Sequence, residues 1–164
     1  LCSGAFIMEK FLRLLNPKSI NYGADRIDGG SPSLTAQDVV LAMSYAKLTQ
    51  FEDNLLRLKY FGANTKSSVK IFSEILVSKY ESKFTESGVS HDYHQSILLI
   101  AVTEFCLVPA SYKPTERARA ALCGWSDTTV RKHMKIWVDR VIQDLNMELS
   151  NGEDKIFTQV SKTK

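Results

Sequence analysis

The sequence predicts an all-α protein, a compact bundle of about seven helices that contains a C-terminal helix-turn-helix. Apolar residues recur at spacings of three and four along most of the chain, which is typical of amphipathic helices. No segment shows the sustained alternation of apolar and polar residues that half-buried strands have. Near the C-terminus, two helical patterns meet at one short turn, and the preceding residues are interpreted as the body on which they pack.

The N-terminal part is expected to contain an extension, a short helix and a long loop. Residues 1–10 are interpreted as an N-terminal extension of open origin, without a basic leader and too short for a secretory signal. Residues 11–109 form the predicted helical body, which begins with a short apolar helix that stops before Pro17. Residues 16–34 follow as a long loop rich in proline and glycine. A loop of this length is usually functional or mobile, and a plain linker is the alternative.

Four helices are predicted in the rest of the body. The first begins at a capping pattern of Thr35 and Asp38, and the second covers residues 51–60. The third, residues 67–83, carries nearly cancelling charges on an outer face that we expect to be solvated. The fourth, residues 90–108, is apolar on more than one face and is expected at the centre of the core. The predicted apolar faces contain Val39, Val40, Met43 and Ala46 in the first helix and Val69, Phe72, Ile75, Leu76 and Tyr80 in the third.

Residues 110–149 form the predicted helix-turn-helix unit. Pro114 suits a first helical position, Gly124 suits a left-handed turn, and Ser126 suits the N-cap of the second helix. Asn151-Gly152 is expected to end that helix and leave residues 150–164 as a C-terminal tail. Trp125 is expected to wedge between the two helices. The residues predicted to pack the unit are Ala120, Gly124, Trp125 and Val130.

The second helix of this unit is predicted to expose hydroxyl groups and cations. With Val130 turned inward, helical geometry turns the polar residues around it outward. Arginine can grip a guanine edge, threonine can contact a thymine methyl group or a phosphate, and lysine neutralises phosphate charge. His133 departs from the pattern, because an apolar residue is commoner at its position. The predicted DNA-binding residues are Ser126, Asp127, Thr128, Thr129, Arg131, Lys132 and Lys135, and the predicted phosphate contacts are Lys113, Arg117 and Arg119.

The charge distribution favours the same interpretation. Between Lys113 and Lys135, six lysines and arginines oppose two acids, a local charge of +4, whereas the whole chain carries +3. A phosphate-docking surface requires such a local concentration of positive charge. An ordinary helical hairpin with a solvated polar face is the alternative.

Other chemistry has weaker support. His91 and His94 are close enough on a helix to share a metal ion, with Asp92, Glu104 or Cys106 as partners, but no convincing third or fourth ligand follows. We expect them at an exposed helix start. The sequence contains no phosphate-cradling glycine loop, no HExxH motif and no nucleophile elbow, so we expect no catalysis, no metal and no cofactor. No apolar run reaches membrane-spanning length, and the three cysteines form no CxxC pair, so we expect a cytoplasmic protein without disulfides.

Two segments together resemble a known family. ASYKPTERARAALCGWSDTTVRKHMKIW and NPKSINYGADRIDGGSPSLTAQDVV are similar to the late antitermination proteins of lambdoid phages, of the phage 21 type. The resemblance covers nearly all of the chain after about Phe11. It implies an all-helical protein that binds a double-stranded DNA element at a phage late promoter through the helix-turn-helix. It also implies loading onto paused bacterial RNA polymerase that still holds sigma factor, and narrowing of the RNA-exit channel around the nascent RNA.

Several points stay open after this resemblance. The loop at 16–32 and the region 51–67 are our expected polymerase contacts. An apolar stripe that includes Trp137 and Leu145 is expected to be core, and a second copy on the DNA is the alternative use. The competing function is an ordinary helix-turn-helix repressor or activator that acts at initiation, and a structural helical adaptor is the third.

Overall fold

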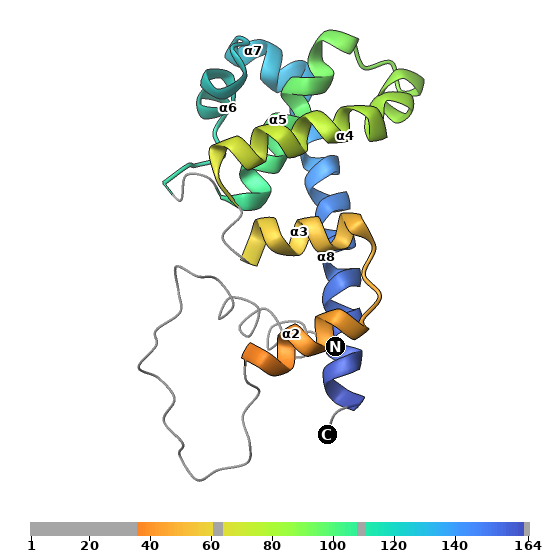
Figure 1. Ribbon diagram of the computed structural model, residues 1–164. Coiled ribbons are helices and arrows are strands. Elements are labelled where there is room, and N and C mark those ends of the chain that lie inside the picture. Colours follow the sequence, from red (N-terminus) through yellow and green to blue (C-terminus); the bar gives the residue numbers. More distant parts are fainter. Residues whose placement is uncertain (1–35, 61–63, 108–110, 163–164) are drawn as a thin grey trace. The chain divides into compact units, whose positions relative to one another are not determined.

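The described part of the chain is helical throughout. The computed structural model describes residues 36–60, 64–107 and 111–162, and none of these residues forms a strand (Figure 1). The all-α prediction is therefore confirmed. The predicted extension at 1–10, the short helix that begins at Phe11 and the loop at 16–34 lie outside the described residues. The helices are α2 (Ala36–Tyr45), α3 (Gln50–Tyr60), α4 (Lys66–Glu86), α5 (His91–Cys106), α6 (Glu116–Cys123), α7 (Asp127–Thr129), the π-helix η1 (Val130–Met134) and α8 (Lys135–Lys162).

The contacts divide the chain into two compact units. One contains α2, α3 and residues 147–162, and the other contains residues 64–146. We had expected α4 and α5 to group with α2 and α3 in one body. Instead α5 contacts α4, α6 and η1, so these helices form one unit with the predicted helix-turn-helix segment.

The first unit buries one face of α3 and of the last part of α8. Leu55 and Leu56 in α3 and Ile156 in α8 are fully buried. The Tyr60 hydroxyl donates a 2.6 Å hydrogen bond to Glu153 Oε1, and Lys155 Nζ donates to Glu52 Oε1. The expected C-terminal tail is therefore wrong, because α8 continues to Lys162 and supplies core residues to this unit.

Gly152 explains why the helix does not end where the sequence suggested. A Cβ atom at this position would lie 3.3 Å from Glu52 Cβ and 3.4 Å from Leu56 Cδ1. Gly152 therefore lies where α3 approaches α8 closely, and not in a turn. The predicted face of α2 is also partly wrong, since Val39 is buried while Val40 is exposed.

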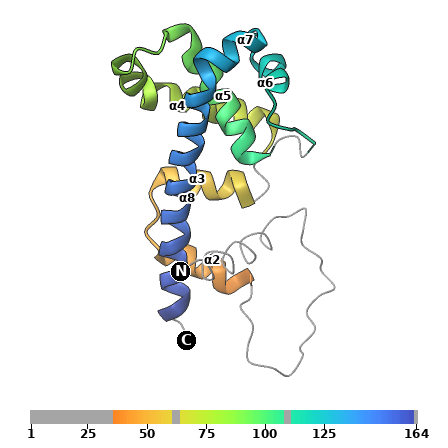
Figure 2. The same cartoon turned by 180° about the vertical axis from the view of Figure 1, so that it is seen from behind.

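The second unit is built around α5. Ile97, Leu98, Ile100, Ala101 and Val102 have no exposed surface, which confirms that this helix occupies the centre of its core. In both views, α4 lies beside it (Figures 1 and 2).

Side-chain caps and aromatic contacts fix α4 in this unit. The Thr65 side chain accepts the Ser68 N–H at the start of α4. Near the end of α4, the Phe84 ring contacts the rings of His94 and Trp137 at centroid distances of 5.1 and 5.7 Å. The predicted apolar face of α4 needs one correction, because Ile75 is exposed and Phe84 is buried. No described helix has the length and apolarity that crossing a bilayer requires.

Candidate nucleic-acid interface

Local hydrogen bonds define both ends of α6. Thr115 Oγ1 accepts the Ala118 N–H at 3.1 Å, so Thr115 is the N-cap and Pro114 precedes it instead of opening the helix. At the other end, Gly124 has φ 78° and its N–H donates to the Ala120 carbonyl at 2.8 Å. This left-handed conformation suits glycine, as predicted, because a Cβ atom would strain it.

The next helix begins two residues later. Ser126 Oγ accepts the Thr129 N–H at 3.2 Å, which confirms Ser126 as the N-cap of α7. The helix then widens, and the Lys135 N–H donates to the Val130 carbonyl across the π-turn of η1. π-Turns inside helices occur frequently at functional sites. The sequence does not predict this turn, which includes Arg131 and Lys132.

The inward face of this segment is apolar. Val130, Met134 and Val138 have no exposed surface, and Ala120 on α6 is buried. Helix α6 contacts both α7 and η1. The packing roles predicted for Ala120 and Val130 therefore agree with their burial.

Trp125 does not wedge between the two helices, contrary to expectation. Its side chain remains 36% exposed and lies against α5, where its ring meets the Tyr93 ring edge-on at 5.0 Å. Its indole N–H donates a 3.0 Å hydrogen bond to Ser96 Oγ. His133 stacks on the same Tyr93 ring at 5.5 Å. Helix α5 therefore gives the indole ring of Trp125 an aromatic contact and gives its N–H a hydrogen-bond acceptor.

The outward face carries most of the predicted DNA-binding residues. Ser126, Asp127, Thr128, Arg131, Lys132 and Lys135 are exposed, as are the predicted phosphate contacts Lys113 and Arg117. Thr129 is half-buried, and its hydroxyl is 2.8 Å from Ser126 Oγ. Arg131 retains 55% side-chain exposure although Glu116 Oε2 lies 3.9 Å from its guanidinium. At this distance the carboxylate offsets part of the charge of Arg131 without holding it in a fixed position.

Arg119 is not part of this surface, and its prediction as a phosphate contact is wrong. Its guanidinium donates to both carboxylate oxygens of Glu104 on α5, at 2.8 and 2.7 Å, and both side chains are only 8% exposed. Asp139 on α8 lies 3.6 Å away, and the Tyr112 hydroxyl donates to Glu104 at 3.1 Å. Arginine can form such a bidentate pair because its planar fork matches the carboxylate.

The buried pair changes the protonation of its neighbours. The hydrogen bond to Glu104 raises the pKa of Arg119 above its usual range, so its positive charge is permanent. Burial, followed by the charge of Glu104, raises the pKa of Tyr112, so its hydroxyl stays protonated and keeps donating. The network therefore joins α6 to α5 and α8 and holds in place the helices that carry the exposed cations.

The histidine pair at the start of α5 is not the exposed helix start that we expected. His94 is buried, with Nε2 3.1 Å from the Val89 carbonyl, and only His91 is exposed. Phe84 packs against the His94 ring, which explains the burial. Among the described residues, no group of three or more histidine, cysteine, aspartate or glutamate side chains could hold a metal ion.

Comparison with known proteins leaves the family of this chain open. No protein-family model, no curated protein and no solved structure matches it.

Proposed function

We propose that this protein binds double-stranded DNA through a helix-turn-helix formed by α6 and the continuous α7–η1–α8 helix. The observation that carries the proposal is the division of the second helix into two faces. Val130 and Met134 are fully buried, while Arg131, Lys132 and Lys135 between and beside them are exposed. A helix anchored by one face and cationic on the other is suited to lie in a major groove.

The exposed side chains have different expected roles. Arg131 and Lys132 lie early in the second helix, where side chains of recognition helices reach base edges. Thr128 is suited to a thymine methyl group or a phosphate oxygen. Lys113 and Arg117 flank the start of α6 and are suited to phosphate contacts that fix orientation without reading sequence. Ser126 is expected to act mainly through its cap, because its hydroxyl already accepts the Thr129 N–H.

We further propose that the protein acts as a transcription antitermination factor. This step rests on the resemblance of residues 16–40 and 110–137 to the late antitermination proteins of lambdoid phages. In this function, DNA binding delivers the protein to RNA polymerase that has paused near a late promoter. The loaded polymerase then passes later pauses and terminators.

A single-round transcription assay tests the function. The template carries a late-type phage promoter, a promoter-proximal pause and a downstream terminator, and RNA is measured with and without the protein. We expect read-through that requires the promoter-proximal DNA. If the protein changes only the number of initiated transcripts and leaves termination untouched, it is an ordinary initiation regulator.

Paired arginine variants test the DNA-binding face separately. Arg131→Ala is expected to weaken binding to duplexes selected from a random library by about 1–3 kcal/mol, with helical content unchanged. Arg57→Ala is the matched control, because Arg57 is also an exposed arginine with one acidic neighbour, at 59% side-chain exposure. Equal affinities for the two variants would contradict the proposed face, and a failure to select any duplex would contradict DNA binding itself.

A further inference from the structure

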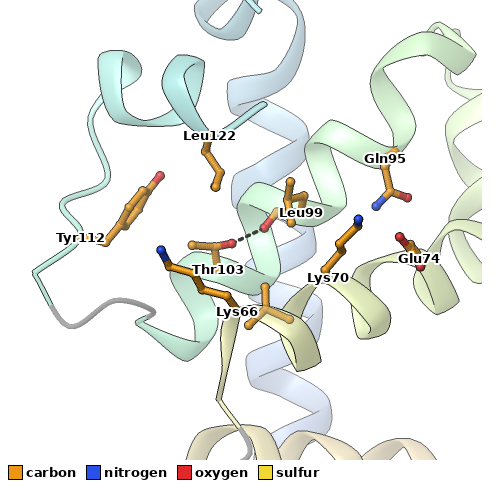
Figure 3. A pocket seen from close by; sticks show the side chains of 9 residues that line it. Lys66, Lys70, Glu74, Gln95, Leu99, Thr103, Tyr112 and Leu122 are labelled. Carbon is orange, nitrogen blue, oxygen red and sulfur yellow. Dashed lines mark hydrogen bonds between the residues drawn. The ribbon is translucent and has the colours of Figure 1, made fainter. Parts of the chain in front are cut away.

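The second unit contains an open pocket whose lining residues include none of the predicted DNA-binding residues. Its volume is about 680 Å³, and its walls come from α4, α5, α6 and the segment before α6 (Figure 3). Val69, Leu99 and Leu122 provide its apolar surface, and Thr103 and Tyr112 complete the wall. Small-molecule sites typically have about 300–1,000 Å³ and mostly apolar walls with a few polar groups.

The polar groups of the inner wall already have protein partners. Thr103 Oγ1 donates to the Leu99 carbonyl at 2.7 Å, and the Tyr112 hydroxyl donates to Glu104 at 3.1 Å. Gln95 Nε2 donates to Ser73 Oγ at 3.1 Å. The wall therefore offers a ligand mainly apolar contact.

The mouth of the pocket differs from the wall. Lys66 and Lys70 border it from successive turns of α4, and neither ammonium group has a hydrogen bond or ion pair with any described residue. Glu74 borders the same pocket one turn further along α4, near Gln95 and away from Lys66 (Figure 3). The Lys66 ammonium points toward Tyr112, whereas the Lys70 ammonium lies at the end that holds Gln95 and Glu74 (Figure 3). Because the charge of Glu74 disfavours an anion at that end, the favourable position for an anion is beside Lys66.

We propose that this pocket binds a small amphipathic carboxylate, with the carboxylate at Lys66 and the apolar body against Val69, Leu99 and Leu122. Charge complementarity selects the anionic head, because the Lys66 ammonium group has no hydrogen bond or ion pair with any residue that the structure describes. The polar groups of the wall already have protein partners, so polar groups of a ligand buried against the wall would lack hydrogen bonds, and an apolar ligand body is favoured. The test of this site needs no DNA.

Titration of the full chain with decanoate tests the site. Methyl resonances of Val69, Leu99 and Leu122 are followed by NMR, and decylammonium serves as the probe with the same apolar chain and the opposite charge. We expect decanoate to shift these three resonances at concentrations where decylammonium leaves them unchanged. Equal binding of the two probes would mean general apolar adhesion and would overturn the proposal, as would no shift with decanoate.

Charge reversal at the mouth provides the second arm. Lys66→Glu is expected to weaken decanoate binding about fivefold or more, because a favourable ion pair becomes a repulsion. Lys79→Glu makes the same charge change on α4 outside the pocket and is expected to bind decanoate like the wild type. Equal weakening by the two variants would show a nonspecific charge effect and refute the site. If Lys66→Glu fails to fold, Lys66→Gln replaces it, and the comparison of the two probes on the wild type remains decisive.

Discussion

Arg119 and Arg131 lie on neighbouring helical segments and meet opposite environments. Arg119 is buried against Glu104, whereas Arg131 projects from η1 with a distant acidic neighbour. Sequence patterns treat both as surface cations of one basic segment. In the structure, Arg119 holds α6 in place, whereas Arg131 belongs to the candidate interface.

The two arginines are therefore expected to respond differently to truncation. Arg119→Ala should lower the free energy of unfolding by about 3–5 kcal/mol, because it leaves the Glu104 carboxylate buried without its partner. Arg131→Ala should change it by less than about 0.5 kcal/mol. Urea denaturation followed by circular dichroism measures both values. Comparable stability of the two variants would mean that the buried pair does not stabilise the fold.

Glu52 gives the first unit a predicted dependence on acid. Burial acts to raise the pKa of Glu52, but hydrogen bonds from Lys155 and Thr49 outweigh it and hold the pKa below its ordinary value of 4.5. A depressed folded-state pKa stabilises the fold above the unfolded pKa, and this contribution is lost as the pH falls through the folded pKa. The acid-sensitive range therefore begins near pH 4.5 and extends below it.

Glu52→Gln should remove this component of the pH dependence. The wild type is expected to lose stability more steeply than the variant as the pH falls below about 4.5, although the variant is less stable at neutral pH. Urea denaturation at a series of pH values measures the two slopes. The expectation fails if both proteins lose stability in parallel through the acid range.

At the scale of elements, the approach of α3 to α8 depends on the missing side chain of Gly152. Gly152→Leu should lower the free energy of unfolding by about 1–3 kcal/mol, because the new side chain must displace Glu52 or Leu56. Asn151→Leu is the control, since Asn151 is the exposed neighbour in the same helix. Thermal unfolding compares the two variants with the wild type. A Gly152→Leu protein as stable as the control would show that α3 can move away without cost.

The π-turn is the second feature that belongs to this scale. It lies between the capped start of α7 and the long α8, and it contains Arg131 and Lys132 of the candidate interface. The turn changes the direction in which successive residues project, so the faces of α7 and α8 are not related by simple α-helical spacing. Side-chain directions that are predicted from α-helical spacing therefore become shifted where the chain passes through residues 130–134.

At the scale of the whole molecule, the net charge is only +3, so the proposed DNA binding is expected to depend on the local cationic surface of the candidate interface. Its exposed cations are Lys113, Arg117, Arg131, Lys132 and Lys135. If each neutralises one phosphate, the logarithm of the DNA-binding constant should fall with the logarithm of salt concentration at a slope of about −4 to −5. Lys113→Gln should make the slope shallower by about 1, measured by fluorescence anisotropy on duplex DNA.

The control for this prediction lies on another helix. Lys79→Gln on α4 removes the same charge away from the candidate interface and should leave the slope unchanged. Equal effects of Lys79→Gln and Lys113→Gln would mean that attraction follows net charge and not the local surface.

The sequence by itself determined the helices and their ends where capping is local. Thr115, Gly124 and Ser126 make their capping hydrogen bonds within four residues along the chain, so a short stretch of sequence contains both partners. The burial of α5 was equally predictable, because its apolar residues cover more than one face. All-helical architecture follows from such local patterns.

Only the tertiary structure decided the features whose partners are distant in sequence. The Trp125 side chain contacts Tyr93 and Ser96 on α5. Gly152 lies inside α8 at a point that α3 approaches closely. Arg119 is buried because it pairs with Glu104. The pocket is lined by residues of separate helices. Burial and pairing depend on which segments meet in space, and helical spacing gives the direction of a side chain without naming the residue that it will contact.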